Sequence, residues 1–269
     1  TRCAELLIQA GAHVDVQDVV GDTPLHEALR NNNKTFADFL LDKGADISIN
    51  RDTLLVCAAG CHHKLVVKLI TEGVSVNVQD EDGDTPLHMA TEQGDEDIVS
   101  ELISRGADVN KHGEYERTAL HCAAEKGHTR CAELLIQAGA HVDVQDDDDG
   151  DTPLHLAVEY RQTECAQILV DKNADVNVRN KQGETPLHLA VFTKITKYWK
   201  ELQVDGDDNL MKILIDEKSD VNIKDNEGNT ALHRAIQHQQ KDCALILIQH
   251  QHTDLAIEDK NGKSAYRLI

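Results

Sequence analysis

The side chains best suited to metal chemistry form a short cysteine and histidine cluster. Cys57 and Cys61 stand four residues apart, and His62 and His63 follow directly. Thiolates one helical turn apart, with imidazoles beside them, could close a tetrahedral zinc site. Alternatively, Cys57 packs in a core and residues 61–63 form an exposed turn between two helices, because Gly60 interrupts the helical register. We favour the second interpretation and predict neither a metal nor another cofactor.

Six of the 15 histidines belong to a recurring tetrapeptide. Thr-Pro-Leu-His begins at residues 23, 85, 152 and 185, and Thr-Ala-Leu-His begins at residues 118 and 230. The copies at 85, 118, 152 and 185 follow one another at intervals of 33 or 34 residues, which marks one structural unit stacked many times. We therefore predict that these histidines are structural. The chain shows no pattern of a catalytic triad or of a phosphate-binding glycine loop.

Each copy of the motif is a predicted helix start. The threonine hydroxyl can accept from the exposed amides of the first turn, and proline suits the first helical position, where its missing N–H costs nothing. Gly94 and Gly106 then fall where the first and second helices of one repeat end. Gly83 lies in an acidic turn between repeats and permits a positive φ. One repeat is therefore predicted to consist of a finger, a first helix, a turn and a second helix.

The motif, followed by segments such as Gly-Ala-Asp-Val-Asn at 106–110, resembles the ankyrin repeat. The resemblance covers the whole chain and implies an all-α ankyrin repeat solenoid of stacked helix-turn-helix units with β-hairpin-like fingers. It also implies that the motif histidines tie helix to loop by hydrogen bonds. We expect a single domain over residues 1–269. Full repeats are predicted at 21–50, 51–82, 83–115, 116–149, 150–182, 183–227 and 228–261, with partial repeats at 1–20 and 262–269.

Composition agrees with such a stack. Only 3% of residues are aromatic, so the core must be built from Leu, Ile, Val and Ala. Cys131, Cys165 and Cys243 each lie 13 residues after a motif threonine and are predicted core residues without disulfides. No apolar run approaches about 18 residues and no leader opens the chain, so we expect no membrane insertion and a cytoplasmic or nuclear location. This fragment is expected to be a monomer.

The second repeat departs most from the pattern. Thr53-Leu54-Leu55-Val56 stands in place of the motif, only 30 residues after the previous copy, and has lost the proline, the histidine and the preceding finger glycine. We take Leu54 as the first helical position and predict a short finger here. Local stability should be lowest around residues 50–66, and Leu54→Pro with Val56→His should raise it.

An insertion near 192–209 lengthens the repeat at 183–227. Ile195, Tyr198, Trp199 and Leu202 have the spacing of one helical face, which predicts an extended first helix. This face either packs on the neighbouring repeat or forms a second partner-binding surface around Tyr198 and Trp199.

Charge is the clearest functional clue. The chain carries 48 acidic and 27 basic residues, for a net charge of −21, and the acids gather in the predicted fingers. The resemblance implies that ligands contact the residue before the motif threonine and the residues seven and eight after it. A basic protein segment suits such a face, whereas nucleic acid would be repelled. Alternatively, the acidic loops only keep the solenoid soluble. The candidate contacts are Asp82, Asp84, Glu92, Glu125, Asp148, Asp149, Asp151, Glu159, Tyr160 and Glu184.

We therefore predict a non-catalytic protein-interaction scaffold that binds a basic segment on an acidic concave face. The alternative is the substrate-recruiting arm of a larger enzyme such as a ubiquitin ligase, since residues 21–30 look like repeats of the mind bomb ligases. A designed binder is disfavoured by the irregular second repeat and the insertion. The family resemblance also implies hydroxylation at the asparagine that ends the Gly-Ala-Asp-Val-Asn segment. Asn110 fits best, followed by Asn77, Asn177 and Asn222, although each can be explained by turn hydrogen bonds alone.

Residues 1–18 are identical to residues 129–146, and the two copies diverge at once afterwards. A natural duplication, a grafted helix and a misassigned sequence are three explanations. Because the chain starts and stops inside repeats, we expect an excerpt of a longer protein.

Overall fold

A computed structural model describes residues 2–191, 208–216 and 219–268. Its helices group into two compact units, Thr1–Glu114 and Tyr115–Ile269. The first unit contains α1 (Arg2–Gln9), α2 (Pro24–Arg30), α3 (Lys34–Asp42), α4 (Arg51–Ala59), α5 (His63–Thr71), α6 (Pro86–Gln93) and α7 (Glu96–Ser104). A 3₁₀ helix, η1 (Glu114–Glu116), marks the boundary in sequence. The second unit contains α8 (Ala119–Lys126), α9 (Thr129–Gln137), α10 (Pro153–Glu159), α11 (Thr163–Asp171), α12 (Pro186–Val191), α13 (Asp208–Asp216), α14 (Ala231–Gln237), α15 (Lys241–Gln249) and α16 (Ala265–Leu268).

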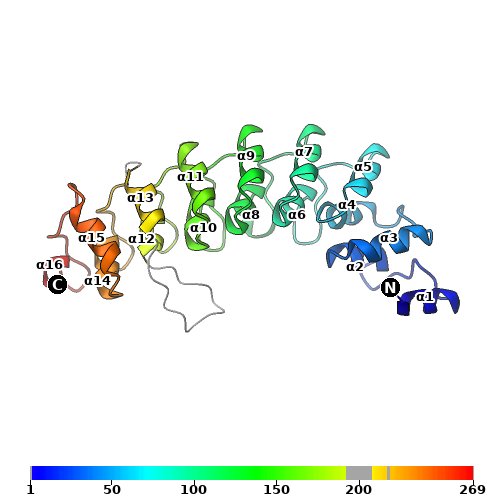
Figure 1. Ribbon diagram of the computed structural model, residues 1–269, viewed down its shortest axis with the longest axis horizontal. Coiled ribbons are helices and arrows are strands. Elements are labelled where there is room, and N and C mark those ends of the chain that lie inside the picture. The colour runs from blue at the N-terminus through cyan, green and yellow to red at the C-terminus, as the bar shows by residue number, and fades with distance from the viewer. Residues whose placement is uncertain (1, 192–207, 217–218, 269) are drawn as a thin grey trace. The chain divides into compact units, whose positions relative to one another are not determined.

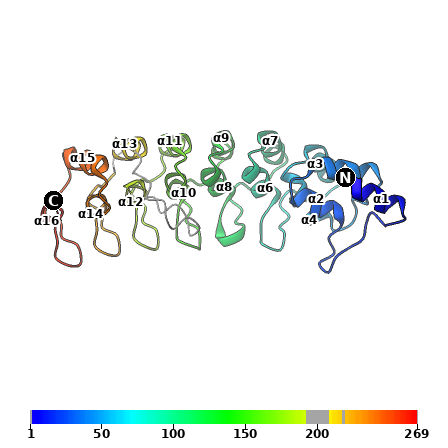
Figure 2. The same cartoon turned by 60° about the horizontal axis from the view of Figure 1, so that its bottom comes forward.

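Within each unit the helices stack in repeating pairs (Figure 1). In the second unit α8, α10, α12, α14 and α16 pack in sequence as one row, while α9, α11, α13 and α15 form the other row (Figure 2). In the first unit α4 packs between α2 and α6. The described residues contain one isolated β-bridge, between Glu258 and Ser264, and no strand. The predicted all-α solenoid fold is confirmed, whereas the repeat boundaries and the single domain stay predictions.

The motif works as the sequence indicates. Thr152 Oγ1 accepts from the backbone N–H of His155, and the Nδ1 atom of His155 accepts the N–H of Thr152 at 3.2 Å. Because Nδ1 is an acceptor, the ring proton lies on Nε2, which donates to the carbonyl of Glu184 in the next finger at 3.1 Å. Burial lowers the pKa of His155 to about 4, so the ring stays neutral. The predicted link from helix to loop is confirmed.

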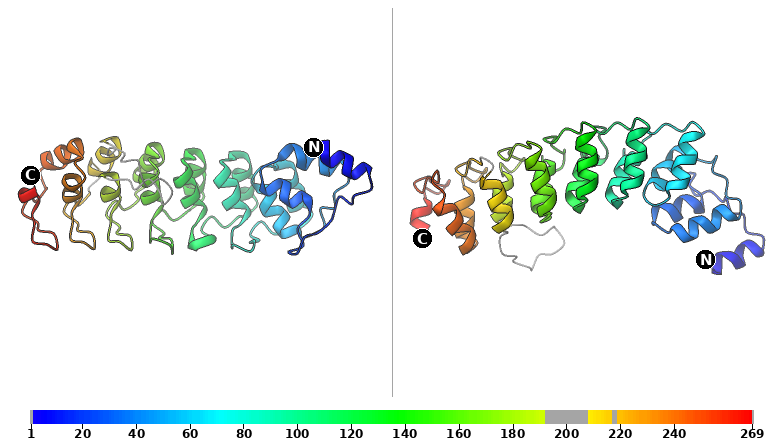
Figure 3. Two further views of the ribbon diagram at one scale, coloured as in Figure 1. Left: turned by 90° about the horizontal axis from the view of Figure 1, so that it is seen from below. Right: turned by 45° about the horizontal axis from the view of Figure 1, so that its top comes forward.

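The fingers are turns built around aspartate or asparagine. In the first unit, Asp80 Oδ1 accepts the backbone N–H groups of Asp82 and Asp84, and Gly83 has a φ of 88°. This is the positive φ that the sequence predicts for that glycine. In the second unit, the fingers lie side by side along one edge in Figure 2 and in the left view of Figure 3. There Gln145 donates to the carbonyl of Arg179 in the next finger, at 3.0 Å.

The second repeat begins its helix earlier than the sequence suggests. Helix α4 starts at Arg51, and Asn50 precedes it in the left-handed region with φ of 44°. Leu54 is therefore inside the first turn and donates its N–H to the carbonyl of Asn50 at 2.9 Å. The prediction that Leu54 is the first helical position is wrong, because Asn50 tolerates the left-handed backbone that lets the helix start sooner. A proline at 54 would remove this bond, so the proposed repair would destabilise the repeat.

The cysteine and histidine cluster is structural. Cys57 is buried as expected, and residues 60–62 lie between α4 and α5, whereas His63, which was predicted in the turn, begins α5. His62, however, is only 5% exposed, so the prediction of an exposed turn is wrong at this residue. Its Nδ1 atom accepts the N–H of Leu65 at the start of α5, and Nε2 lies 3.0 Å from Asp38. A helix cap explains its burial, because the imidazole satisfies an amide of the first turn.

Further sequence predictions concern the core cysteines, a metal site, a membrane span and the insertion. Cys131, Cys165 and Cys243 are at most 2% exposed, which confirms them as core residues. Across the described ranges no three His, Cys, Asp or Glu side chains gather closely enough to hold a metal ion, and no helix has the length and apolarity to cross a membrane. Tyr198 and Trp199 lie outside the described residues, between Val191 at the end of α12 and Asp208 at the start of α13.

Candidate partner-binding site

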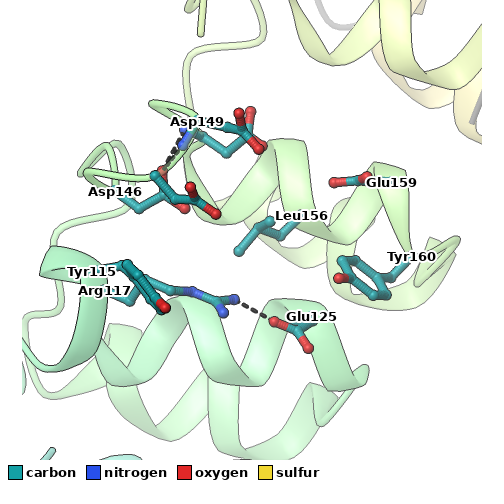
Figure 4. Close-up of a pocket in the computed structure, with 10 residues that line it drawn as sticks. Tyr115, Arg117, Glu125, Asp146, Asp149, Leu156, Glu159 and Tyr160 are labelled. Carbon is teal, nitrogen blue, oxygen red and sulfur yellow. Dashed lines mark hydrogen bonds and ion pairs between the residues drawn. The ribbon is translucent and has the colours of Figure 1, made fainter. Parts of the chain in front are cut away.

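Six of the ten predicted contact residues line one pocket in the second unit (Figure 4). The pocket has a volume of about 270 Å³ and lies between the finger at 146–151 and helices α8 and α10. Because the predicted residues come from separate fingers and helices, their meeting in one cavity depends on the stacking of two repeats. The lining residues are Tyr115, Arg117, Glu125, Asp146, Asp148, Asp149, Asp151, Leu156, Glu159 and Tyr160.

The finger that forms one wall is held rigid by its own backbone. Asp146 Oδ1 accepts three backbone N–H groups, from Asp149, Gly150 and Asp151, at 2.9–3.2 Å. In the next finger, Lys181 Nζ lies 3.2 Å from the carboxylate of Asp147. The acidic side chains of this finger therefore lie on a rigid loop. A partner that binds them loses little free energy to ordering of the loop.

The α8 side of the pocket is neutralised internally. Glu125 Oε2 lies 2.5 Å from Arg117, and Oε1 lies 3.0 Å from Lys126. Burial alone would raise the pKa of Glu125, but the hydrogen bond and charge of Arg117 outweigh it, and the pKa is lowered. In Figure 4 this ion pair runs along one side of the pocket. Glu125 is thus an acid whose charge is already matched.

The α10 side is different because two carboxylates lie there without a cation. Asp151 is 5% exposed, and its Oδ1 accepts an N–H of the Asn180 amide at 2.9 Å. Glu159 ends α10 and points to the same pocket (Figure 4). In the part of the chain that the structure describes, no Lys, Arg or His lies within ion-pair distance of either carboxylate.

The electrostatic consequence is a high proton affinity at both acids. Burial raises the pKa of Asp151 to about 7, and the charges of Asp146, Asp149 and Glu184 add to it, against the Asn180 hydrogen bond. Burial followed by the charge of Asp151 raises the pKa of Glu159 to about 7 as well. Each group would be stabilised as an anion by a cation entering the pocket.

The other four predicted contacts lie elsewhere. Asp82 lines a separate pocket of about 220 Å³ in the first unit, together with Asp22 and Arg30. Asp84 accepts the N–H of Glu114 at 3.1 Å. Neither Glu92 nor Glu184 lines the cavities described above.

Glu184 in particular is not an open acid. It is 7% exposed and pairs with Arg234 at 2.6 Å, so its charge is satisfied inside the protein. Glu184 is neutralised by a tertiary contact with the following repeat. Its place before a motif threonine does not by itself predict this contact.

Sequence reasoning missed four lining residues, namely Tyr115, Arg117, Asp146 and Leu156. Arg117 stands directly before motif residue Thr118, in the column that contains Asp84 and Asp151, so the column itself could have pointed to it. Tyr115 has a φ of 55°, and its carbonyl accepts the N–H of Asp147 at 2.8 Å. Nothing in the motif indicates that this strained residue turns into the pocket.

The asparagines considered for hydroxylation hold neighbouring repeats together. In the first unit, Asn77 Oδ1 accepts the N–H of Asp108 at 2.8 Å, and its amide donates to the carbonyl of Gly106. Asn177 and Asn222 accept equivalent backbone N–H groups from Asp220 and Asp254. Asn110 donates its own N–H to Asp108 Oδ1 at 3.0 Å. The structural role that the turn hydrogen bonds suggest is present at Asn77, Asn177 and Asn222.

Comparison with known proteins agrees with the repeat architecture. A family model described as ankyrin repeats (3 copies) matches residues 1–51, 54–146 and 199–267, and a second one, ankyrin repeats (many copies), matches residues 135–190. The chain is similar to the Ankyrin repeat and KH domain-containing protein mask of Drosophila melanogaster, with 38% identity over 88 residues. It is also similar to the human Ankyrin repeat and KH domain-containing protein 1, with 37% identity over 87 residues.

A third relative is the ADP-ribosylation factor GTPase-activating protein AGD4 of Arabidopsis thaliana, with 46% identity over 48 residues. These three matches cover 30%, 30% and 18% of this chain, and 2%, 3% and 6% of the relatives. The similarity therefore covers only a small part of each relative, and ankyrin repeats in general serve as protein-interaction modules. The motif, the helix pairs and the two family models together show that the chain belongs to the ankyrin repeat family.

Proposed function

We propose that this chain is a non-catalytic scaffold that binds a basic segment of a partner protein at the acidic pocket of the second unit. Membership of the ankyrin repeat family supports a protein partner in general. The observation that supports a basic partner is the pair of carboxylates, Asp151 and Glu159, which line the cavity and form no ion pair among the described residues, whereas the Arg117 guanidinium in the same lining is paired with Glu125. A lysine or arginine from outside would relieve their repulsion.

The shape and charge of the site favour a polypeptide over other ligands. Six acidic side chains and one arginine line the pocket, which would repel phosphate groups of a nucleic acid. The remaining lining consists of two tyrosines and Leu156. These side chains can cover the methylene stem of a basic residue while the carboxylates hold its charged end.

Reversal of charge tests the proposal. The probe is a fluorescent decapeptide of alternating basic and serine residues, whose association with the chain is followed by stopped-flow anisotropy at low and high salt. Asp149→Lys, Asp151→Lys and Glu159→Lys together should slow association, and the loss should shrink as salt screens charges over about 8–10 Å. The matched control is Asp42→Lys, Glu164→Lys and Asp171→Lys, which has the same net charge but changes exposed acids of second helices. Equal association by both triple variants would overturn the proposal.

We also propose that the repeat asparagines are substrates for an asparaginyl hydroxylase, with Asn110 first. Support comes only from the family resemblance and from the position of Asn110 at the end of its repeat segment. Asn77, Asn177 and Asn222 contact the next repeat and Asn110 has interaction partners as well, so each side chain would have to leave its contacts before an enzyme could reach it. Mass spectrometry of the chain from animal cells should show a 16 Da increase, about one oxygen atom, on the Asn110 peptide above all others. Absence of this increase from all four peptides would refute the idea.

The role of the array as the recruiting arm of a larger enzyme stays a prediction. No described contact favours it over a free-standing scaffold, and the same pocket would serve either arrangement.

A further inference from the structure

Side chains at two positions of the repeat interact with each other in several repeats of the chain. The residue before the motif threonine and the seventh residue after it lie side by side in three repeats. Arg30 lies 2.5 Å from Asp22, Arg117 lies 2.5 Å from Glu125, and the amide of Gln237 donates to Asn229 at 3.0 Å. Each pair balances itself, with opposite charges in the first two and neutral amides in the third.

The same two positions of the repeat at 150–182 hold Asp151 and Glu159, which cannot balance each other. Asp151 is only 5% exposed and faces the pocket. Among the residues that the structure describes, the only side chain that contacts its carboxylate is the neutral amide of Asn180. In the repeats whose motifs begin at Thr23 and Thr118 one of the two positions holds a guanidinium, whereas Asp84 and Glu92 are a second pair of acids in the repeat at 83–115. A guanidinium supplied by a partner would give Asp151 and Glu159 the neutralisation that Arg30 gives Asp22 and Arg117 gives Glu125.

The chain also shows how one guanidinium satisfies two carboxylates. Arg234 contacts Asp225 through Nε at 2.8 Å and through an amino nitrogen at 2.7 Å, and its other amino nitrogen lies 2.6 Å from Glu184. This planar fork can contact two acids at once, whereas the ammonium of lysine acts as a point charge. The buried carboxylate of Asp151 and the half-buried carboxylate of Glu159, which line one cavity, therefore favour arginine over lysine.

We propose that the pocket is a subsite for a single arginine side chain of the partner, whose guanidinium binds between Asp151 and Glu159. The proposal rests on the proposed function and adds the identity of the residue that enters. A volume of about 270 Å³ lies just below the range of pockets for whole small molecules, which suits one long side chain. Tyr160, Tyr115 and Leu156 also line the cavity, where aromatic rings suit a bound cation and apolar surface suits its stem.

Three peptides separate this proposal from general electrostatic attraction. They are a fluorescent decapeptide with four arginines spaced by serines, the same peptide with lysines, and the same peptide with uncharged citrullines. Their affinities are measured by fluorescence anisotropy at one ionic strength. The arginine peptide should bind about tenfold more tightly than the lysine peptide, since only arginine contacts both acids in a planar, bidentate way. The citrulline peptide should not bind.

Conservative variants assign the preference to these two acids. Glu159→Gln and Asp151→Asn should each reduce the preference for arginine to about twofold or less, while Glu164→Gln, an exposed acid of α11, should leave it unchanged. Glu159→Arg should fill the pocket from within and abolish binding, and circular dichroism checks that each variant is folded.

The outcomes distinguish the two proposals. If the arginine and lysine peptides bind equally and the triple charge reversal weakens both, the arginine subsite is wrong and the basic partner stands. If the variants at 151 and 159 keep the full arginine preference, the subsite is again wrong. If neither peptide binds at low salt, both proposals are wrong.

Discussion

Two stretches of this chain have the same eighteen residues, 1–18 and 129–146, in different surroundings. In α9, Leu135 is fully buried and Cys131 is 1% exposed, because this helix packs against α8 and α11. In α1 the equivalent Leu7 is 62% exposed, Cys3 is exposed, and no residue of the helix is buried. The comparison teaches that an amphipathic helix supplies an apolar face, while its neighbours determine whether that face is buried.

The comparison extends into the residues that follow the identical stretch. Asp22 and Asp151 occupy the same position before the motif threonine, and both are 5% exposed. Burial raises the pKa of each, but the hydrogen bond and charge of Arg30 bring the pKa of Asp22 below its usual value. The pKa of Asp151 is raised to about 7 by burial, and the neighbouring acids add to the effect where Asp22 has an arginine. One side chain seven residues after the threonine, Arg30 or Glu159, separates a balanced pair from an unbalanced one.

Thiol labelling should give the largest difference between the two copies. Under native conditions Cys3 should react with a maleimide at least about 1000-fold faster than Cys131, which is exposed only when α9 opens. Mass spectrometry of labelled peptides after a time course measures both rates, and the Cys3→Ser variant identifies the fast thiol. Similar rates at the two cysteines would show that α1 is covered in solution.

Truncation of the matching leucines should differ by a few kcal/mol. Leu135→Ala should lower the free energy of unfolding of the second unit by about 3 kcal/mol, through lost burial and the cavity that remains. Leu7→Ala, in the same local sequence, should change stability by less than about 0.5 kcal/mol. Urea unfolding followed by circular dichroism provides both values. A large loss from Leu7→Ala would contradict the exposure of α1.

Two substitutions that swap the arginine and the glutamate at this position should change the free energy of unfolding by about 1–2 kcal/mol in opposite directions. This figure allows for the solvent exposure of Arg30. Glu159→Arg should stabilise the second unit at pH 8 by creating with Asp151 the pair that Arg30 forms with Asp22. Arg30→Glu should destabilise the first unit by creating the acid pair. Thermal unfolding at fixed pH measures both, with Glu164→Arg as the control for net charge. Changes of the same sign in the two variants would contradict the pairing.

The smallest effect is a pH-dependent gain of about 1 kcal/mol from Glu159→Gln. The pKa of Glu159 is about 7 in the folded state, against its ordinary value of 4.5, so the folded protein holds a proton that the unfolded chain releases between these values. The ionised group therefore costs stability above pH 7 and costs nothing below about pH 4.5. The variant should be more stable than the parent at pH 8 and equally stable near pH 4.5.

The titration of the buried histidines does not interfere with the comparison of variant and parent. Burial lowers the pKa of His155 and His188 to about 4, so their contribution is complete above pH 6.5 and is lost as the pH falls towards 4. The parent and the Glu159→Gln variant share this histidine contribution, so it cancels when their stabilities are subtracted at each pH. A gain that stays constant from pH 8 to pH 4.5 would show that Glu159 is not perturbed.

Local chemistry in the sequence was sufficient to predict most of the fold. Thr152, Pro153 and His155 specify a helix start through one cap, one fixed φ and one buried hydrogen bond, and these interactions need only nearby residues. The same reasoning failed at Leu54, where Asn50 starts the helix earlier from a left-handed conformation that the motif does not encode. It failed again at His62, whose burial depends on its capping role.

The sequence alone determined which residues are acidic and that they recur at defined positions of the repeat. Only the tertiary structure decided which acids keep an unmatched charge. Glu125 is balanced by Arg117, and Glu184 is balanced by Arg234 from the next repeat. Asp151 and Glu159 meet across a cavity without such a partner in the described residues. The reason is physical: charge composition belongs to the chain, whereas the strength of an ion pair depends on distance and burial, which exist only after the repeats have stacked.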